Sequence, residues 1–479
     1  MTKISPMDMV FLLMENATRR LHMTAFMMFK KPAGQEATFV PRMVEAYRNS
    51  QPVAPFNRKL KWLEQGLAAW ETVKPDMTYH VRSISLPSPG SMEQFYETIS
   101  FLNTSLLDRG HPLWECYVID GIEGDRVALL TKVHHALIDG EGGLRVMRES
   151  LSESSRSKAF TAPWMANVKA PKPRARRPSP SQMEKIQGLF QRLSKLPGDL
   201  IGMGSEAVSI GAQSLNLKSR GTSLPFTAPR CLYNNTAQSA ARAYANIELP
   251  LDEVKELAKA TGTSVNDVVM TFIDQALHDY LHEHKASVSK PLVAFMPMSL
   301  RAESGDQEGN QVAVELIAMG KPRASISERL QQINAATQSA KDKGRGMQKA
   351  TRQVYTLLLA GSLALTDTLP VFGKIPSANL VISNMKGPAE QLYLAGAPMV
   401  AFHGLPILPP GAGLNVTFAS VNKDICLAIA AAPEAVHEPY RLATLIQQAF
   451  SNLQAEVAGT KPKPKSKPAS PRRSPKAKA

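Results

Sequence analysis

The sequence predicts a protein of the mixed α/β class (α+β with mixed sheets) that is divided into two domains. Its 479 residues, 43% apolar and 20% charged, are enough for two or three domains at roughly 150 residues each. Short Val/Ile/Leu-rich runs alternate with helical periodicity in two regions, residues 1–155 and 241–458. A basic, proline-rich stretch separates these regions, so we expect one domain on either side of it.

The first region, residues 1–155, mixes short strands with helices. Residues 115–120 and 126–134 are apolar runs joined by the sequence Gly-Ile-Glu-Gly-Asp, which is typical of a β-hairpin with a glycine-containing loop. Residues 141–151 then have helical character.

The middle of the chain, residues 156–240, is expected to be a basic linker followed by a crossover helix. Apolar side chains recur at helical spacing in residues 182–196, with lysine and arginine between them. This pattern favours an ordinary helix packed on a domain, although a helix that contacts a lipid surface is the alternative. Residues 459–479 alternate proline with lysine and arginine, and predict a disordered basic tail.

The second region, residues 241–458, begins with a strand at 243–249 and a helix at 251–261. Thr263 or Ser264 is expected to cap a longer helix that starts at residue 265. Further strands are predicted at 292–298, 379–383, 414–418 and 425–430, and a closing helix at 439–457.

The charge and the cysteines exclude several classes of protein. The net charge is +15, but residues 461–479 and 169–180 carry thirteen of the positive charges without an acid. The remainder is nearly neutral, so we expect no nucleic-acid partner. Three widely spaced cysteines, Cys116, Cys231 and Cys426, suggest neither a disulfide framework nor a zinc site. With no pattern typical of a secretory signal or a bilayer span, a cytoplasmic location is expected.

The sequence HHALIDG, which begins at His134, carries the candidate chemistry. A neutral imidazole can take a proton from a hydroxyl near neutral pH. Because neighbouring side chains on a strand point to opposite faces, only one of His134 and His135 is expected to serve as the base. Asp139 can orient an imidazole or bind a distant arginine such as Arg301, and the residues alone leave both roles open. The HExxH spacing of a zinc site is missing, so no metal is expected.

This motif resembles the HHxxxDG signature of the CoA-dependent acyltransferases, and its surroundings resemble one branch, the bacterial wax ester synthase/diacylglycerol acyltransferases. The resemblance covers most of the chain up to about residue 455. It rests on SPMDMVFLLMENATRRLHM (5–23), YHVRSISLPSPG (79–90), LDRGHPLWECYVIDGI (107–122), SVNDVVM (264–270), PMSLR (297–301), GNQV (309–312) and NLVISNMKGP (379–388).

The resemblance implies two chloramphenicol-acetyltransferase-like domains with the active site in a tunnel between them. It implies transfer of a fatty acyl group from acyl-CoA, as co-substrate and without another cofactor, to a fatty alcohol or a diacylglycerol. His135 would be the general base, with Asp139 structural and Gly140 allowing a tight turn. The pair matching Asn266 and Asp267 matters for activity in the family, and we infer that Asn266 donates to the oxyanion.

Further expectations concern Trp114, the isolated histidines and the association of the protein with lipid surfaces. Trp114 is interpreted as a packing anchor, and the isolated His22, His80 and His403 as structural or surface residues. The basic and amphipathic segments are expected to hold the protein on the inner face of the cell membrane or on lipid inclusions such as droplets. The alternatives are an acyltransferase with another alcohol or amine acceptor, and a basic membrane- or nucleic-acid-binding protein with an inactive core.

Overall fold

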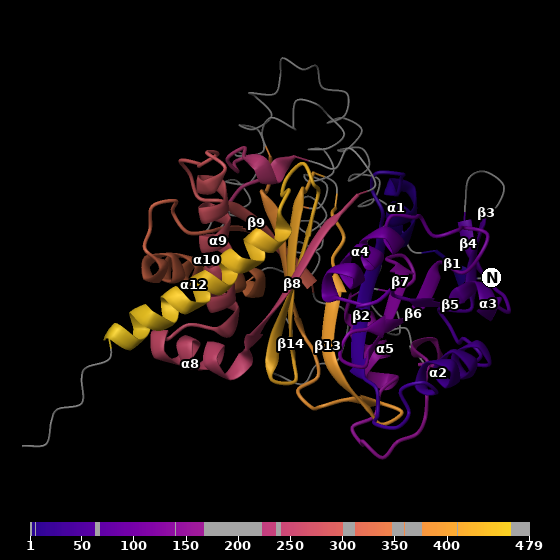
Figure 1. Cartoon of the computed structure of the whole chain (residues 1–479). Coiled ribbons are helices and arrows are strands. Elements are labelled where there is room, and N and C mark those ends of the chain that lie inside the picture. The colour runs from indigo at the N-terminus through magenta and orange to yellow at the C-terminus, as the bar shows by residue number, and fades with distance from the viewer. Residues whose placement is uncertain are drawn as a thin grey trace, which may run out of the picture.

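The computed structural model describes residues 2–4, 6–62, 68–138, 140–166, 223–235, 241–299, 312–346, 359, 376–409 and 411–460. Two six-stranded sheets lie next to each other, one in each half of the molecule, and a small three-stranded sheet lies at the far side of the first half (Figure 1). The predicted helix at 182–196, the tail beyond residue 460, Asp139 and Arg301 lie outside the described residues.

The first large sheet has the strand order β12-β13-β2-β7-β6-β5 and is antiparallel except for the β5–β6 pair. The predicted hairpin is confirmed as β6 and β7. The strands are β2 (His22–Lys30), β5 (Val81–Ser85), β6 (Trp114–Ile122), β7 (Arg126–His134), β12 (Tyr393–Leu394) and β13 (Ala397–Leu405). The small sheet contains β1 (Thr2–Lys3), β3 (Arg58–Trp62) and β4 (Ala68–Thr72).

Helices cover both faces of this sheet. Successive side chains of a strand point to opposite faces, and both faces here carry apolar side chains that must be buried. Met27 and Phe29 of β2 pack in the apolar cluster that includes side chains of α2 and α5, whereas Phe26 and Met28 pack in the cluster that includes α4. The helices of this half are α1 (Pro6–Met14), α2 (Phe39–Arg48), α3 (Met77–His80), α4 (Met92–Leu102) and α5 (Gly140–Glu149).

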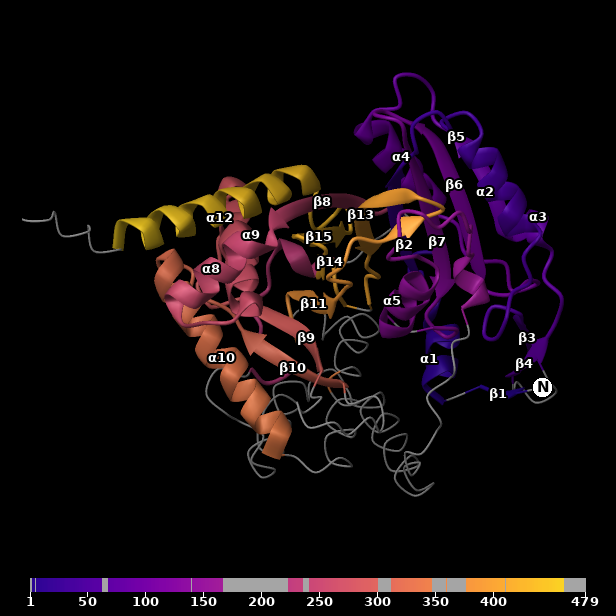
Figure 2. The same ribbon diagram turned by 90° about the horizontal axis from the view of Figure 1, so that it is seen from below.

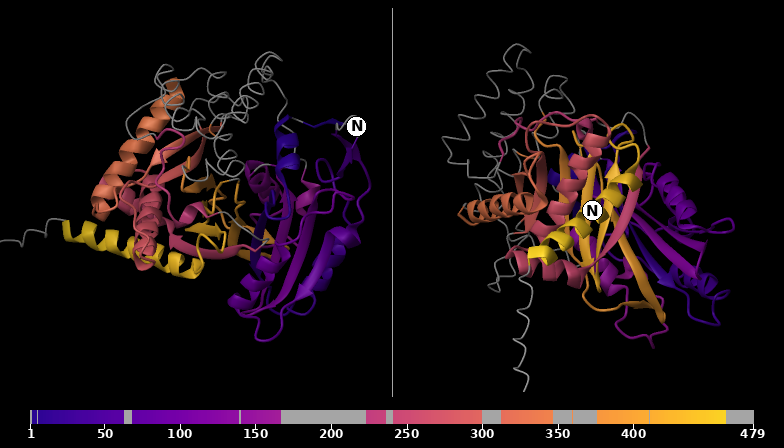
Figure 3. Two further views of the ribbon diagram at one scale, coloured as in Figure 1. Left: turned by 90° about the horizontal axis from the view of Figure 1, so that it is seen from above. Right: turned by 60° about the vertical axis from the view of Figure 1, so that its left-hand side comes forward.

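The second large sheet has the strand order β10-β9-β11-β14-β15-β8, with parallel pairing of β11 to both neighbours. Its helices gather on one side of the sheet, as Figure 2 and Figure 3 show. The strands are β8 (Ala243–Pro250), β9 (Val293–Ser299), β10 (Val312–Ala318), β11 (Leu380–Lys386), β14 (Leu414–Val421) and β15 (Asp424–Ala431). The helices are α8 (Leu251–Thr261), α9 (Val265–Glu283), α10 (Ile326–Gly346) and α12 (Pro439–Thr460). All the strands and helices predicted for this region are found.

One hairpin crosses between the two halves. β12 and β13 follow β11 in the chain, yet β13 pairs with β2 along residues 399–405 and so extends the first sheet. Without β13, β2 would be an edge strand with a row of unpaired backbone groups. The sequence analysis assigned all of residues 241–458 to the second domain and did not predict that this hairpin joins the first sheet.

The two halves share one apolar core. The largest cluster of buried side chains joins Phe26 and Tyr117 of the first sheet to Tyr244 and Ile247 of the second. Across the described segments, no helix combines the length and the apolar character that spanning a bilayer needs.

Candidate active site

The paired histidines lie at the end of β7, between two neighbouring segments. The amide of His134 donates to the carbonyl oxygen of Leu113 at 2.9 Å, and the amide of His135 donates to that of Leu21 at 2.9 Å. His134 is fully buried, whereas His135, just beyond the strand, is half-buried. The two rings therefore occupy different environments, as strand alternation predicts.

The tautomer of His134 follows from its backbone neighbour. Its Nδ1 accepts a hydrogen bond from the amide of Ala136 at 3.1 Å, so Nδ1 carries a lone pair and the neutral ring carries its proton on Nε2. That Nε2 lies 3.5 Å from Oε1 of Glu15. A buried carboxylate thus faces the N–H of the first histidine, which fixes the direction of the ring.

Glu15 connects this histidine to two other parts of the site. Its Oε1 accepts from the amide of Leu21 at 3.2 Å, and its Oε2 accepts from Nη2 of Arg109 at 3.4 Å. Burial favours a higher pKa for Glu15, but the contacts with His134, Leu21 and Arg109 outweigh it and lower the pKa, so the carboxylate is ionised at neutral pH. Sequence reasoning missed Glu15; its one signal was a single acid directly after an apolar run.

His135 faces the N-terminal helix α1. Its ring stacks on that of Phe11, with the centroids 4.3 Å apart and the planes inclined by 26°. The stacked phenyl ring covers one face of the imidazole, while part of the residue's surface stays exposed. A half-buried imidazole is the kind of group that general-base chemistry needs.

The Pro112-Leu113-Trp114 segment supports the histidines from the neighbouring strand. Trp114 is buried, and its Nε1 donates to the carbonyl oxygen of Phe56 at 2.8 Å. Its ring stacks on His80 at 4.2 Å and on Trp164 at 4.8 Å. The interpretation of Trp114 as a packing anchor agrees with these contacts.

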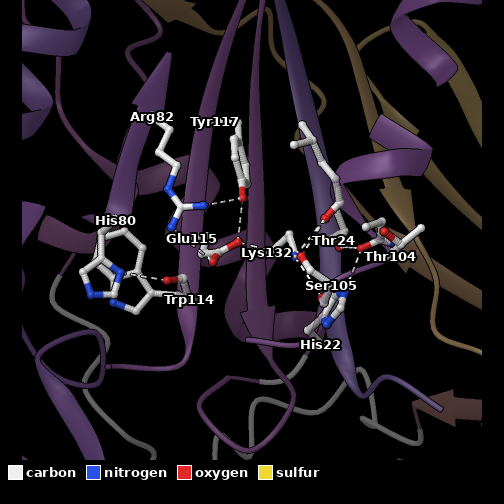
Figure 4. A network of polar contacts seen from close by, with 12 residues as sticks. His22, Thr24, His80, Arg82, Thr104, Ser105, Trp114, Glu115, Tyr117 and Lys132 are labelled. Carbon is white, nitrogen blue, oxygen red and sulfur yellow. Dashed lines mark hydrogen bonds and ion pairs between the residues drawn. The ribbon is translucent and has the colours of Figure 1, made fainter. Parts of the chain in front are cut away.

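Figure 4 shows a buried ion pair between Lys132 of β7 and Glu115 of β6. Lys132 lies two residues before His134 and therefore on the same face of the strand. Nζ of Lys132 lies 3.4 Å from Oε2 of Glu115, which also accepts from the hydroxyl of Tyr117 at 2.8 Å. Lys132 further donates to the carbonyl oxygens of Leu102 at 2.9 Å and Ser105 at 3.2 Å. Lys132 thus ties the end of α4 and the loop after it to the strand that carries the histidines.

Asn103, in that loop, links the two halves. Its Oδ1 accepts from Nε2 of His22 at 2.7 Å and from the hydroxyl of Thr24 at 2.6 Å, and its Nδ2 donates to the hydroxyl of Tyr244 on β8. His22 is the cross-strand neighbour of His134. Burial, followed by the charge of Lys132, lowers the pKa of His22 to about 3, so this ring is neutral at physiological pH.

Asn266 and Asp267 lie in the first turn of the long helix α9, and their contacts differ. Asp267 is fully buried; its Oδ2 accepts from the amide of the cap residue Ser264 at 3.1 Å, and its Oδ1 accepts from the hydroxyl of Thr337 at 2.6 Å. Ser264 is therefore the cap, and Asp267 holds the start of α9. Asn266 accepts on Oδ1 from Nδ2 of Asn384 at 3.2 Å and places its own Nδ2 3.3 Å from the sulfur of Met270.

β11 brings the second half against the histidine motif. Gly140, which begins α5, approaches Met385 so closely that a Cβ there would lie 3.4 Å from its sulfur. Met385 follows Asn384, the partner of Asn266, in the chain. Three of the four candidate catalytic residues, His134, His135 and Asn266, are thus described. Asn266 is connected to the histidine motif through β11, whose Asn384 contacts Asn266 and whose Met385 contacts Gly140. The fourth, Asp139, lies outside the described residues.

The cysteines are poorly suited to act as nucleophiles. Burial raises the pKa of Cys116 far above its usual range, that of Cys231 to about 11 and that of Cys426 to about 12. All three are therefore thiols at neutral pH, whereas the thiolate is the reactive form. A covalent intermediate on one of these cysteines is therefore disfavoured.

Both parts of the chain match models of known families. Residues 4–269 match the wax ester synthase/diacylglycerol acyltransferase catalytic domain, and residues 308–454 match the WS/DGAT C-terminal domain. The probable diacylglycerol O-acyltransferase Tgs4 of Mycobacterium tuberculosis is 63% identical over 466 residues, which cover 96% of this chain and 98% of that protein. The O-acyltransferase WSD of Acinetobacter baylyi is 32% identical over 463 residues, covering 96% and 98%.

Solved structures agree with the fold. The wax ester synthase/diacylglycerol acyltransferase from Marinobacter aquaeolei VT8 superimposes with a TM-score of 0.74 at 25% identity, over 95% of this chain and 100% of that one. The first condensation domain of the calcium-dependent antibiotic synthetase reaches a TM-score of 0.50 at 12% identity over 95% of this chain and 96% of that one, a likeness of fold alone. The predicted two-domain mixed α/β architecture is confirmed.

Proposed function

Because the chain belongs to the wax ester synthase/diacylglycerol acyltransferase family and is an acyltransferase, we propose that it esterifies a long-chain fatty alcohol, a diacylglycerol or both with a fatty acyl group from acyl-CoA. The observation that carries this proposal is the match to both family domains, together with 63% identity to a protein named as a diacylglycerol O-acyltransferase. The experiment described below distinguishes this substrate class from other alcohol or amine acceptors.

We propose His135 as the general base of a direct reaction in a ternary complex. The imidazole takes the proton of the acceptor hydroxyl while the oxygen attacks the thioester carbonyl. The C–S bond then breaks, the new C–O bond remains, and the proton passes to the departing CoA thiolate. A thiolate leaves without prior protonation, so no separate acid is required.

Asn266 is proposed to stabilise the oxyanion of the tetrahedral intermediate. Its amide nitrogen faces the sulfur of Met270, and a thioether is a weak acceptor. The bond from Asn384 to Oδ1 fixes the opposite end of the amide. The amide N–H can therefore turn to a developing negative charge without breaking a strong hydrogen bond.

His134 and Asp139 are proposed as structural members of the motif. The amide of Ala136 occupies Nδ1 of the fully buried His134, and Nε2 faces Glu15 at 3.5 Å, which leaves that ring unsuited to accept a substrate proton. For Asp139 the proposal rests on the family resemblance. Apart from acyl-CoA as co-substrate, the reaction proposed here needs no cofactor.

The basic segments within 156–240 and 459–479 are proposed to hold the protein at the cytoplasmic face of an anionic membrane or at lipid droplets. The support is their run of thirteen positive charges without an acid and the insolubility of the proposed acceptors and products. A chain ending at residue 459 should lose salt-sensitive binding to anionic liposomes. If the truncated chain binds the liposomes as strongly as the full-length chain, the tail has no part in membrane binding.

The acceptor is tested by following CoA release from palmitoyl-CoA with hexadecanol, with a diacylglycerol and with neither, while the ester is identified by mass spectrometry. We expect acceptor-dependent ester with at least one of the two acceptors. Folded protein that forms ester with neither would overturn the proposed substrate class and redirect the search to other alcohols and amines.

A further inference from the structure

Three side chains with metal-binding chemistry meet where β13, a strand of the first sheet, contacts the second sheet. One ligand atom from each of Glu248, His403 and Cys426 lies within 4.8 Å of the other two. Glu248 comes from β8, Cys426 from its register partner position on β15, and His403 from β13. The three strands lie together in Figure 2. Nothing in the sequence spacing of these residues indicated a site, because the fold alone assembles them.

His403 can bind a metal ion through a ring nitrogen. The side chain is buried, with Nε2 3.1 Å from Oε1 of Glu248 and Nδ1 without a hydrogen-bond partner among the described residues. In the metal-free site Nε2 donates to the Glu248 carboxylate, and a metal ion would replace that proton while Nδ1 takes up the proton of the neutral ring. In a tetrahedral zinc site with Zn–N and Zn–O bonds of about 2.05 Å, the nitrogen and oxygen ligand atoms lie about 3.3 Å apart. The distance of 3.1 Å between Nε2 of His403 and Oε1 of Glu248 is close to that value.

Cys426 and Asp424 add a sulfur and a second carboxylate. Two residues apart on β15, they are on the same face of the strand. A cation at this point would stabilise the carboxylates and the thiolate.

Space and access are available for an ion. Glu248, Asp424 and Cys426, but not His403, line a hollow of about 20 Å³, which is room for roughly one water molecule or ion. His403 lies behind Glu248, with its Nε2 3.1 Å from Oε1 of that side chain. The side chain of Glu248 is 43% exposed, so the hollow can be reached from solvent.

We propose that Glu248, His403 and Cys426, with Asp424 beside them, form a binding site for a divalent metal ion of the zinc type. Sulfur, imidazole nitrogen and carboxylate oxygen together are the donor set that such ions prefer. On binding, the Cys426 thiol releases its proton to water and the sulfur bonds to the metal. The ion would fasten β13, which belongs to the first sheet, to β8 and β15 of the second, and so brace the junction of the two halves. The site is independent of the proposed acyl transfer.

The test is a titration of the full-length, metal-free protein with Co²⁺, followed by its absorption spectrum. We expect one equivalent to produce a near-ultraviolet thiolate-to-cobalt charge-transfer band and visible bands of a four-coordinate ion. Zn²⁺ should displace the cobalt and raise Tm, because it binds the folded state. A wild-type protein without the thiolate band would overturn the proposal.

Matched variants locate the site. Cys426→Ser should remove the charge-transfer band, and Cys231→Ala should retain it; the reverse result would overturn the assignment. Glu248→Gln, at a partly exposed position that tolerates the change, should weaken cobalt binding by about tenfold or more, while the exposed Glu256→Gln leaves it unchanged. Equal affinities of these two variants would contradict the role of Glu248 even if Cys426→Ser failed to fold.

Discussion

The carboxylate of Glu15 provides the sharpest test of how the histidine pair is held. Glu15→Gln keeps the shape of the side chain but removes the charge that faces Nε2 of His134, the amide of Leu21 and Nη2 of Arg109. A hydrogen bond to a charged group contributes about 1.5–3 kcal/mol net. The three contacts are long, at 3.2–3.5 Å, and glutamine retains one acceptor. We therefore expect the free energy of unfolding at pH 7 to fall by about 2 kcal/mol.

The pH dependence of this loss follows from the lowered pKa of Glu15. A carboxyl group whose pKa is lower in the folded state stabilises the fold above its unfolded pKa, near 4.5, and loses that contribution as the pH falls through the folded value. The difference between wild type and Glu15→Gln should be constant between about pH 5.5 and 7 and shrink below about pH 4.5. Urea unfolding monitored by circular dichroism at several pH values measures it.

Activity should change as well, because Glu15 orients the ring that precedes the proposed base. A misalignment that raises the barrier by about 1.4 kcal/mol lowers kcat about tenfold, whereas the exposed control Glu45→Gln should leave both kcat and stability unchanged. Wild-type stability and kcat in Glu15→Gln would refute the reasoning, and so would a stability difference that persists undiminished at pH 3.

Further predictions concern the support of the site. Lys132→Met leaves the buried Glu115 without its nearest cation and should cost about 3 kcal/mol in urea unfolding; a loss below 1 kcal/mol would argue against the buried pair. Asn384→Ala should lower kcat several-fold with little change in Tm, since it releases the amide of Asn266, and steady-state kinetics with unchanged kcat would contradict this. Trp114→Phe removes the hydrogen bond to the carbonyl of Phe56 and should lower stability by about 1–3 kcal/mol, measured by thermal unfolding; an unchanged Tm would count against the anchor.

The regular elements were predictable because their signals are local. The hairpin of β6 and β7 shows as two apolar runs around a glycine-containing loop, and the start of α9 shows as Ser264 followed three residues later by Asp267. The HHALIDG motif was equally visible, since its residues are adjacent in the chain. Each of these features depends on a few neighbouring residues only.

The remaining features depend on partners distant in sequence. β13 lies in the first sheet because β2 offers an open edge, and no pattern within residues 397–405 marks that partner. Glu15 and Asn103 read as ordinary polar residues, and only the fold brings them to His134 and His22. The meeting of Glu248 with His403 and Cys426 has the same origin.

The central claim, that His135 rather than His134 removes the acceptor proton, is tested most directly by single-turnover acyl transfer from palmitoyl-CoA with the preferred acceptor. His135→Ala and His135→Gln should slow ester formation by about 100- to 10,000-fold while circular dichroism and palmitoyl-CoA binding stay unchanged. His134→Gln should lose stability first and retain more of the chemical rate. His135 variants that form ester at nearly the wild-type rate would contradict the account.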